Sequence, residues 1–184
     1  GAGNISTTGT LSVSGGAVTG QVVNMGTGSG QATFVGVANV NTTAVGNVGI
    51  GTDDLITYSL PANSLSAVGK GIRVTFWGST ANNANAKTFL ANFGSSGNSF
   101  TLTASIAGSW VAEMTVFKTG ANAQDVRIEL RETQANPTLV TTKSAQIVGT
   151  LTETDTSAII IKGTGNATAN NDIIQECLLV EFLN

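Results

Sequence analysis

The 184-residue sequence contains no histidine. This absence removes the side chain most often used for general acid–base catalysis, and with it the Ser-His-Asp and Cys-His nucleophile systems. Histidine-ligated zinc and iron are excluded for the same reason. We therefore predict that the protein is not an enzyme and holds no cofactor or metal.

Charged side chains are also scarce, at 10% of the chain against the usual ~25%. The formal net charge is −3, and the eight lysines and arginines are scattered along the sequence. Nucleic-acid binding needs a basic stripe, so nucleic acid is excluded as a partner. Because a monomer with so few surface charges is prone to associate, we expect much of the surface to be buried in an oligomer or a larger particle.

The sequence has one cysteine, Cys177, and so no intrachain disulfide. Because Cys177 lies in an apolar run, we interpret it as a small core residue rather than a nucleophile. No apolar segment approaches the ~20 residues that cross a membrane. Residues 1–20 lack the basic and apolar regions of a signal peptide. We predict neither a membrane span nor a signal peptide.

What the sequence does have is a strongly apolar final stretch, Asn171–Asn184 (NDIIQECLLVEFLN). Its short length and β-branched residues favour a strand over a helix. A strand that is apolar on both faces must be covered on both. We predict that it is the central strand of the fold.

The first part of the chain, residues 1–51, holds no acidic or basic side chain and is rich in Gly, Ser, Thr and Val. Short alternating pieces such as Thr10–Val13 and Val18–Val23 are separated by glycines. We interpret this part as an extended anchoring arm or a set of short β segments that lies across a neighbouring subunit or a host particle. Phe34–Val40 is a candidate first strand of the globular part.

Residues 52–184 alternate between apolar and polar side chains over short segments, and no helical pattern is convincing. Trp110, Ala112, Met114 and Val116, for example, alternate with Val111, Glu113, Thr115 and Phe117. Further strands are predicted at Leu55–Leu60, Ile72–Trp77, Thr88–Phe93, Phe100–Ile106, Val126–Arg131, Leu139–Val148 and Ala158–Lys162, with loops at Gly78–Ala86 and Gly163–Asn171. The predicted fold class is an all-β antiparallel sandwich, with a jelly roll as the expected type.

The segments Asp54–Leu65 (DLITYSLPANSL), Gly69–Trp77 (GKGIRVTFW), Gly78–Thr88 (GSTANNANAKT) and Gly108–Glu113 (GSWVAE) carry a family resemblance. The matching segments that follow are Lys118–Ala123 (KTGANA), Leu151–Lys162 (LTETDTSAIIIK) and the final stretch. In their order and spacing, residues 52–184 resemble the jelly-roll module of tailed-phage virion proteins, which include head-fibre, capsid decoration and tail-fibre proteins. The resemblance implies a homotrimer on the particle exterior and no catalytic residues.

Carboxylates are the remaining candidates for chemistry, as a glycosidase pair or as calcium ligands. The acidic residues are Asp53, Asp54, Asp125, Asp155 and Asp172, with Glu113, Glu129, Glu132, Glu153, Glu176 and Glu181. Nothing in the sequence pairs any two of them across a cleft. Asp53, Asp54, Asp155 and Asp172 are the calcium candidates, but they lack EF-hand spacing, and we interpret them as turn residues. Gly26–Gly30 and Gly163–Gly165 do not open a helix, so we interpret their glycines as turn residues rather than a phosphate-binding loop.

Three aromatic residues, Tyr58, Trp77 and Trp110, are candidates for a sugar-stacking platform. Trp110 is in register with apolar residues, which predicts a core position. Trp77 falls on the face opposite Ile72, Val74 and Phe76, where we expect a subunit interface and a stacking partner in Arg73.

We therefore expect a structural virion protein of a tailed bacteriophage: a trimeric capsid decoration, head fibre or outer tail-fibre domain. Its expected partners are its own copies and, through the N-terminal arm, other capsid or tail proteins. The alternative is a carbohydrate-binding module for host-surface glycans, with Gly78–Ala86 and Gly163–Asn171 as its binding loops.

Overall fold

The computed structural model describes residues 36–103, 107–134 and 140–183, and the side chains of these residues except 134 and 140–150. The chain divides into two compact units, Gly1–Ala32 and Thr33–Asn184, and all described residues belong to the second. None of them lies in a helix long and apolar enough to cross a membrane. The predicted strand at Phe100–Ile106 and the one beginning at Leu139 each extend partly outside the described residues.

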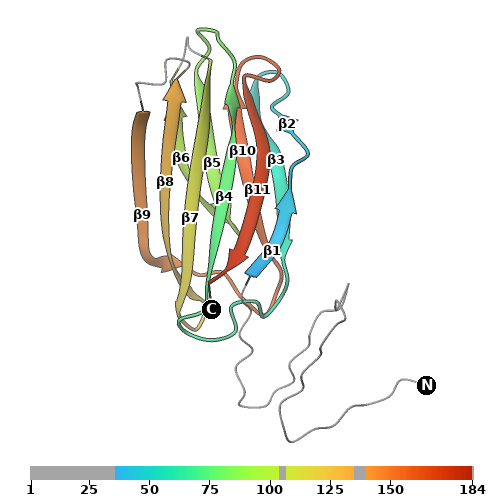
Figure 1. Cartoon of the computed structure of the whole chain (residues 1–184). Coiled ribbons are helices and arrows are strands. Elements are labelled where there is room, and N and C mark those ends of the chain that lie inside the picture. Colours follow the sequence, from blue (N-terminus) through green and yellow to red (C-terminus); the bar gives the residue numbers. More distant parts are fainter. Residues whose placement is uncertain (1–35, 104–106, 135–139, 184) are drawn as a thin grey trace, which may run out of the picture. The chain divides into compact units, whose positions relative to one another are not determined.

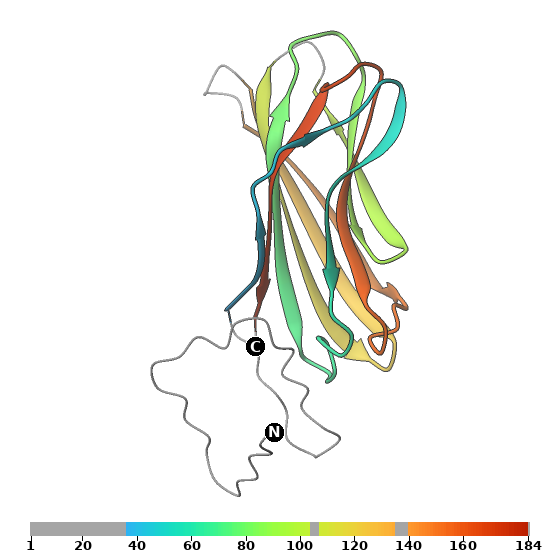
Figure 2. The same cartoon turned by 90° about the vertical axis from the view of Figure 1, so that its right-hand side faces the viewer.

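The second unit consists of two antiparallel sheets packed face to face, which Figure 2 shows as separate layers. The all-β sandwich prediction is confirmed. The larger sheet has the order β1-β11-β4-β7-β8-β9, with β2 also pairing with β11 (Figure 1). Its strands are β1 (Gly36–Asn41), β2 (Val45–Gly46), β4 (Gly71–Thr80), β7 (Gly108–Gly120), β8 (Ala123–Gln134), β9 (Val140–Leu151) and β11 (Ile173–Phe182).

The smaller sheet has the order β3-β10-β5-β6. Its strands are β3 (Gly51–Leu60), β5 (Lys87–Phe93), β6 (Ser96–Leu102) and β10 (Ile159–Ala167). The predicted boundary at Thr52 therefore falls inside β3. Two short strands before it, β1 and β2, pair with β11 and belong to the sandwich. Residues 1–35 of the predicted arm lie outside the described residues.

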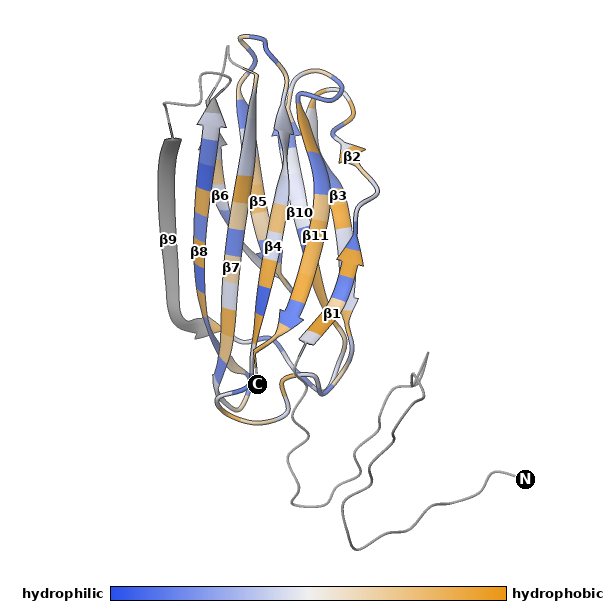
Figure 3. Cartoon of the chain, viewed as in Figure 1, coloured by the Kyte–Doolittle hydropathy of each residue, from blue (hydrophilic) through white to orange (hydrophobic). Residues whose placement is uncertain are grey.

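Apolar and polar residues alternate along the strands (Figure 3). This alternation determines which side chains enter the core. In β7, Trp110, Ala112, Met114 and Val116 are buried as predicted, whereas Val111 and Phe117 are exposed. Three aromatic rings from both sheets meet in the core. Phe89 of the smaller sheet has its ring centroid 5.7 Å from that of Phe76 and 4.3 Å from that of Trp110. The Trp110 indole N–H is satisfied by the backbone oxygen of Ser79 at 3.2 Å.

The final strand, β11, is an interior strand flanked by β1 and β2 on one side and β4 on the other. The prediction that it is central needs correction, because the middle of the larger sheet lies between β4 and β7. Strands β8 and β9 extend the sheet beyond β7 and move its midpoint away from β11. Cys177 is fully buried, as predicted, but it lies outside the contiguous core cluster. Burial raises the pKa of its thiol.

Two predicted loops are wrong in part, because glycines there lie within strands. β4 continues through Gly78 to Thr80, and β10 continues through Gly163 to Ala167. At both glycines another group occupies the space of a Cβ atom: the Ile174 carbonyl oxygen at Gly78, and the Gln175 side chain with the Phe89 ring at Gly163. These glycines permit close approach between elements rather than a turn.

Candidate interaction surface

The outer face of β4, β7 and β8 gathers charged side chains that are scattered in the sequence. Arg73 comes from β4, Glu113 from β7, and Arg127, Glu129 and Arg131 from β8. We call these five residues the charged patch. They include all three arginines of the chain.

Ion pairs connect the members of the charged patch along and across the strands. Arg131 Nε lies 3.3 Å from Glu129 Oε1, and Arg127 Nη2 lies 3.9 Å from Glu129 Oε2. Arg73 Nε lies 3.9 Å from Glu113 Oε1. All five side chains are between about a third and two thirds exposed. Each pair is therefore worth at most about 1 kcal/mol to the fold.

Strand register brings two carboxylates together within the patch. Glu113 of β7 is the direct cross-strand partner of Glu129 of β8, and Thr115 is the partner of Arg127. Like charges in directly opposed positions are unfavourable, and the surrounding arginines offset this repulsion. With Thr115, four patch residues line a shallow depression of about 160 Å³. This pairing was not apparent from the sequence, because it depends on the register between two strands.

Apolar side chains continue the same face beyond the charged patch. Trp77 is half-buried, and its cross-strand neighbour Val111 is 37% exposed. Phe117 lies further along β7 and is 40% exposed. The prediction that Arg73 and Trp77 share this face is confirmed by the alternating burial of β4, although Arg73 pairs with Glu113. Aromatic residues and arginine are the residue types enriched at protein interfaces.

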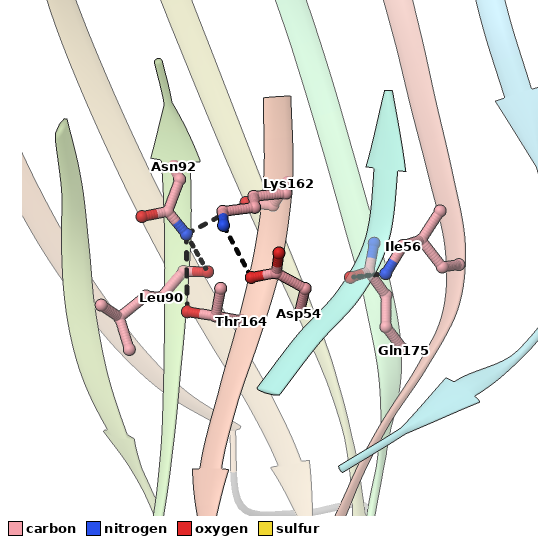
Figure 4. Close-up of polar contacts among 7 residues, drawn as sticks. All are labelled: Asp54, Ile56, Leu90, Asn92, Lys162, Thr164 and Gln175. Atoms are coloured by element: carbon pink, nitrogen blue, oxygen red, sulfur yellow. Dashed lines mark hydrogen bonds and ion pairs between the residues drawn. The ribbon is translucent and has the colours of Figure 1, made fainter. Parts of the chain in front are cut away.

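The outer face of the smaller sheet differs in its chemistry. Lys162 Nζ pairs with Asp54 Oδ1 at 2.6 Å, and Asn92 donates to Lys162 O at 3.3 Å and Thr164 Oγ1 at 3.5 Å (Figure 4). Ile160 is an exposed apolar side chain on this face, at 40% exposure. Lys162, Asp54 and Asn92 on this face are thus bonded to one another's side chains or to nearby backbone and side-chain oxygens.

One end of the sandwich holds a partly buried polar network, which we call the polar plug: Asn47, Asn83, Asn85, Lys87 and Asp172. Lys87 Nζ donates to Asn83 Oδ1 at 2.8 Å, to Asn85 O at 3.1 Å and to Asn83 O at 3.2 Å. Asp172 Oδ2 accepts from Asn85 Nδ2 and from the Ala169 N–H, both at 2.9 Å. The plug thus connects the β4–β5 loop to the β10–β11 loop.

The pKa of Asp172 is lowered from its ordinary value. Desolvation of the carboxyl group raises this pKa, but hydrogen bonds from Asn83, Asn85, Ala169 and Thr168 outweigh it. Asn47 completes the plug: its Oδ1 accepts from the Ile173 N–H at 3.0 Å, and its Nδ2 donates to Ala169 O at 2.8 Å. The asparagines and the lysine of the plug are therefore engaged in holding the two loops.

The four aspartates considered as calcium candidates are dispersed. Asp54 pairs with Lys162 and Asp155 with the buried Lys118. Asp53 accepts a hydrogen bond from the Val48 N–H at 2.9 Å, and Asp172 belongs to the polar plug. Across the described ranges, no three acidic or cysteine side chains are close enough to hold a metal ion.

The three aromatic candidates for a sugar-stacking platform occupy different places. Trp110 is in the core, Trp77 is on the outer face of the larger sheet, and Tyr58 lies on β3 of the smaller sheet. Tyr58 packs against the core, and burial raises the pKa of its hydroxyl group. Trp77 alone remains available at the candidate surface.

Neither a scan against protein-family models nor a search of curated proteins finds a match for this chain.

Proposed function

We propose that the sandwich is a jelly roll with one inserted hairpin. Leaving out β2, β8 and β9, the first strand pairs with the last (β1 with β11) and the second with the second to last (β3 with β10). The remaining four pair in the same nested way, β4 with β7 and β5 with β6. Such nesting arises when one long antiparallel hairpin folds over into two sheets, which is the jelly-roll arrangement. The β8–β9 hairpin then extends the larger sheet beyond β7.

We further propose that the protein, with this fold, is a structural virion protein of a tailed bacteriophage. It forms a homotrimer on the particle exterior, as a capsid decoration, head fibre or outer tail-fibre domain. Its mechanism is geometric: subunits bury one face of the sandwich against one another, and residues 1–51 bind other virion proteins. The resemblance of residues 52–184 to phage jelly-roll modules supports a place in the virion of a tailed phage.

The observation that carries the assembly role is the composition of one outer face. In a chain with 10% charged residues, the charged patch lies beside Trp77, Val111 and Phe117 on the larger sheet. Apolar side chains at both ends of a patch that contains the three arginines suit a subunit interface. We propose this face as the self-association surface.

The test is the mass of the full chain in solution. Sedimentation equilibrium and light scattering at micromolar concentration are expected to give a trimer. A stable monomer under these conditions would overturn the proposal.

A second candidate function is carbohydrate binding, and one observation favours it. The two loop regions predicted to bind glycans meet at the polar plug, where Asn82, Asn170 and Asn171 remain exposed. Exposed amide side chains can donate to and accept from sugar hydroxyl groups. A glycan array with the full chain tests this role, and no binding at high protein concentration would count against it.

A further inference from the structure

The connection between β2 and β3 presents two large apolar side chains to solvent. Val48 is 70% exposed and Ile50 is 83% exposed, more than any other large apolar side chain in the described part of the chain. β2 belongs to the larger sheet and β3 to the smaller one, so the connection passes from one sheet to the other (Figure 2). Two apolar side chains together on one loop need an explanation that a single exposed one does not.

Hydrogen bonds hold this connection in place. The Val48 N–H donates to Asp53 Oδ2 at 2.9 Å. The Gly49 N–H donates to Asn170 Oδ1 at 2.6 Å, and the Gly49 carbonyl oxygen accepts from Asn47 Nδ2 at 3.2 Å. Gly49 has a φ of +68°, which glycine adopts without strain. Because the loop is pre-organised, little conformational entropy would be lost when a partner covers it.

The charges next to the loop indicate the chemistry of that partner. Asp53 and Asp54 follow it directly, and residues 1–51 carry no charge. Lys162 pairs with Asp54, so one negative charge is left in excess. An anionic membrane surface would be repelled here. A protein surface that is apolar and has basic side chains beside its apolar area fits better.

The outer face of the larger sheet has this chemistry. Trp77 of β4, Val111 of β7 and Arg131 of β8 follow one another as direct cross-strand neighbours. This row places two apolar side chains beside an arginine. The charged patch as a whole has three arginines against two glutamates, so one positive charge is in excess. The face therefore complements the β2–β3 connection in both apolar area and charge.

A closed trimer needs two such surfaces on every subunit. Around a three-fold axis subunits associate head to tail, so each contact joins one surface of a subunit to a different surface of the next. Resting on the assembly role proposed above, we propose that the β2–β3 connection of one subunit packs against Trp77 and Val111 of the next. β2 lies toward the β1 end of the larger sheet, and β7 and β8 lie toward its β9 end. One subunit can thus present the two surfaces to two neighbours.

Cysteine cross-linking of the full-length protein tests this inference. A variant with both Ile50→Cys and Val111→Cys carries one new thiol on each surface, while the native Cys177 is buried. After treatment with a short bis-maleimide, we expect linked species of two and three chains on a denaturing gel, because each subunit contacts both neighbours. Mass spectrometry should identify peptides that join positions 50 and 111. Each single variant should give no linked chains, since it has a new thiol on only one surface.

The matched control replaces Ile50→Cys by Val68→Cys. Val68 is 65% exposed on the connection from β3 to β4, at the opposite end of β3. Combined with Val111→Cys, it should give no linked chains. Linked chains from the Ile50→Cys single variant would show contact between two loops and contradict the proposal. Links only within one chain, equal linking by the control, or no links at all would contradict it as well.

Sedimentation of the untreated samples separates this contact from the assembly role. A trimer of the double variant without links overturns the contact alone, whereas a monomeric wild type overturns the assembly role. A second measurement does not depend on the reach of the reagent. Ile50→Lys would bring a positive charge to the basic face and should weaken the trimer at least about tenfold, whereas Val68→Lys should not. An undiminished association constant for Ile50→Lys would overturn the contact.

Discussion

Gln175 on the larger sheet accepts a hydrogen bond through Oε1 from the backbone N–H of Ile56 on the smaller sheet, at 3.3 Å (Figure 4). Both strands are irregular at this point. The register of β3 with β10 shifts so that Leu55 and Ile56 face the single residue Gly163, and the register of β11 with β4 shifts at Glu176. Gln175 Nε2 donates to Cys177 O at 3.1 Å. One fully buried amide thus satisfies backbone groups beside both irregularities.

Replacing Gln175 by leucine is expected to destabilise the fold by roughly 1–3 kcal/mol, because a buried Ile56 N–H would lose its acceptor. The adjacent exposed residue provides the control, since Glu176→Gln should change stability by less than about 0.5 kcal/mol. Urea denaturation of both variants measures the difference. Equal midpoints for Gln175→Leu and wild type would show that the bond contributes nothing.

The glycine facing Gln175 gives a second test. A Cβ atom at Gly163 would collide with the Gln175 side chain and the Phe89 ring, whereas one at Gly165 meets Leu55 Cδ1 at an ordinary 3.4 Å. We expect Gly163→Ala to cost about 1–3 kcal/mol through overpacking. Gly165→Ala, two residues away on the same strand, should cost clearly less. Thermal unfolding of the two variants measures both losses of stability. Equal losses for Gly163→Ala and Gly165→Ala would contradict the overpacking expected at Gly163.

These two glycines show where sequence-based prediction stops. Alternation along β7 predicted which residues enter the core, because burial of alternate side chains is a local property of a strand. Gly163-Thr164-Gly165 was interpreted as a turn, because glycines usually interrupt strands. This segment belongs to β10 because it pairs with β3 and β5. Glycine is needed at position 163 because the Gln175 side chain occupies the space above it. Neither contact is local.

Prediction from local sequence patterns was limited in the same way at the candidate interaction surface. Trp77 was assigned to an outer face from the pattern of β4 alone. The opposition of Glu113 and Glu129, in contrast, depends on the pairing register of β7 with β8, which no local pattern specifies. The buried Lys87 was missed as well, because its acceptors are backbone and asparagine oxygens of a loop rather than a carboxylate.

Asp172 is expected to make the fold sensitive to acid. Its pKa is lower in the folded protein than its ordinary value of 3.8, so its stabilising contribution is present above that value. The contribution is lost as the pH falls through the folded-state pKa, because the carboxyl group binds a proton more readily in the unfolded chain. Asp172→Asn should therefore flatten the decline in stability below pH ~4. Urea denaturation of wild type and variant across this range measures it, and parallel profiles would contradict the assignment.

Cys177 offers a probe of local opening. Its thiol is fully buried and burial raises its pKa, so little reactive thiolate is exposed in the native state. A thiol reagent should modify it only when β11 opens, at a rate that increases with urea in step with unfolding. Val40→Cys, at an exposed site on β1, is the control and should react at once. Modification of native Cys177 as fast as the control would show that the strand is more open than this packing allows.

The proposed self-association surface is tested by two matched substitutions. Val111 on the larger sheet is 37% exposed and Ile160 on the smaller sheet is 40% exposed, so lysine at either site costs the isolated subunit similar packing. Val111→Lys places a positive charge opposite Arg131 within the proposed interface, and should weaken assembly at least about tenfold, or 1.4 kcal/mol. Ile160→Lys should leave the trimer intact. Sedimentation equilibrium gives the association constants, and circular dichroism confirms that both variants are folded. If only Ile160→Lys weakens the trimer, the interface lies on the smaller sheet instead. If the trimers of both variants are equally stable, Val111 is not part of the interface.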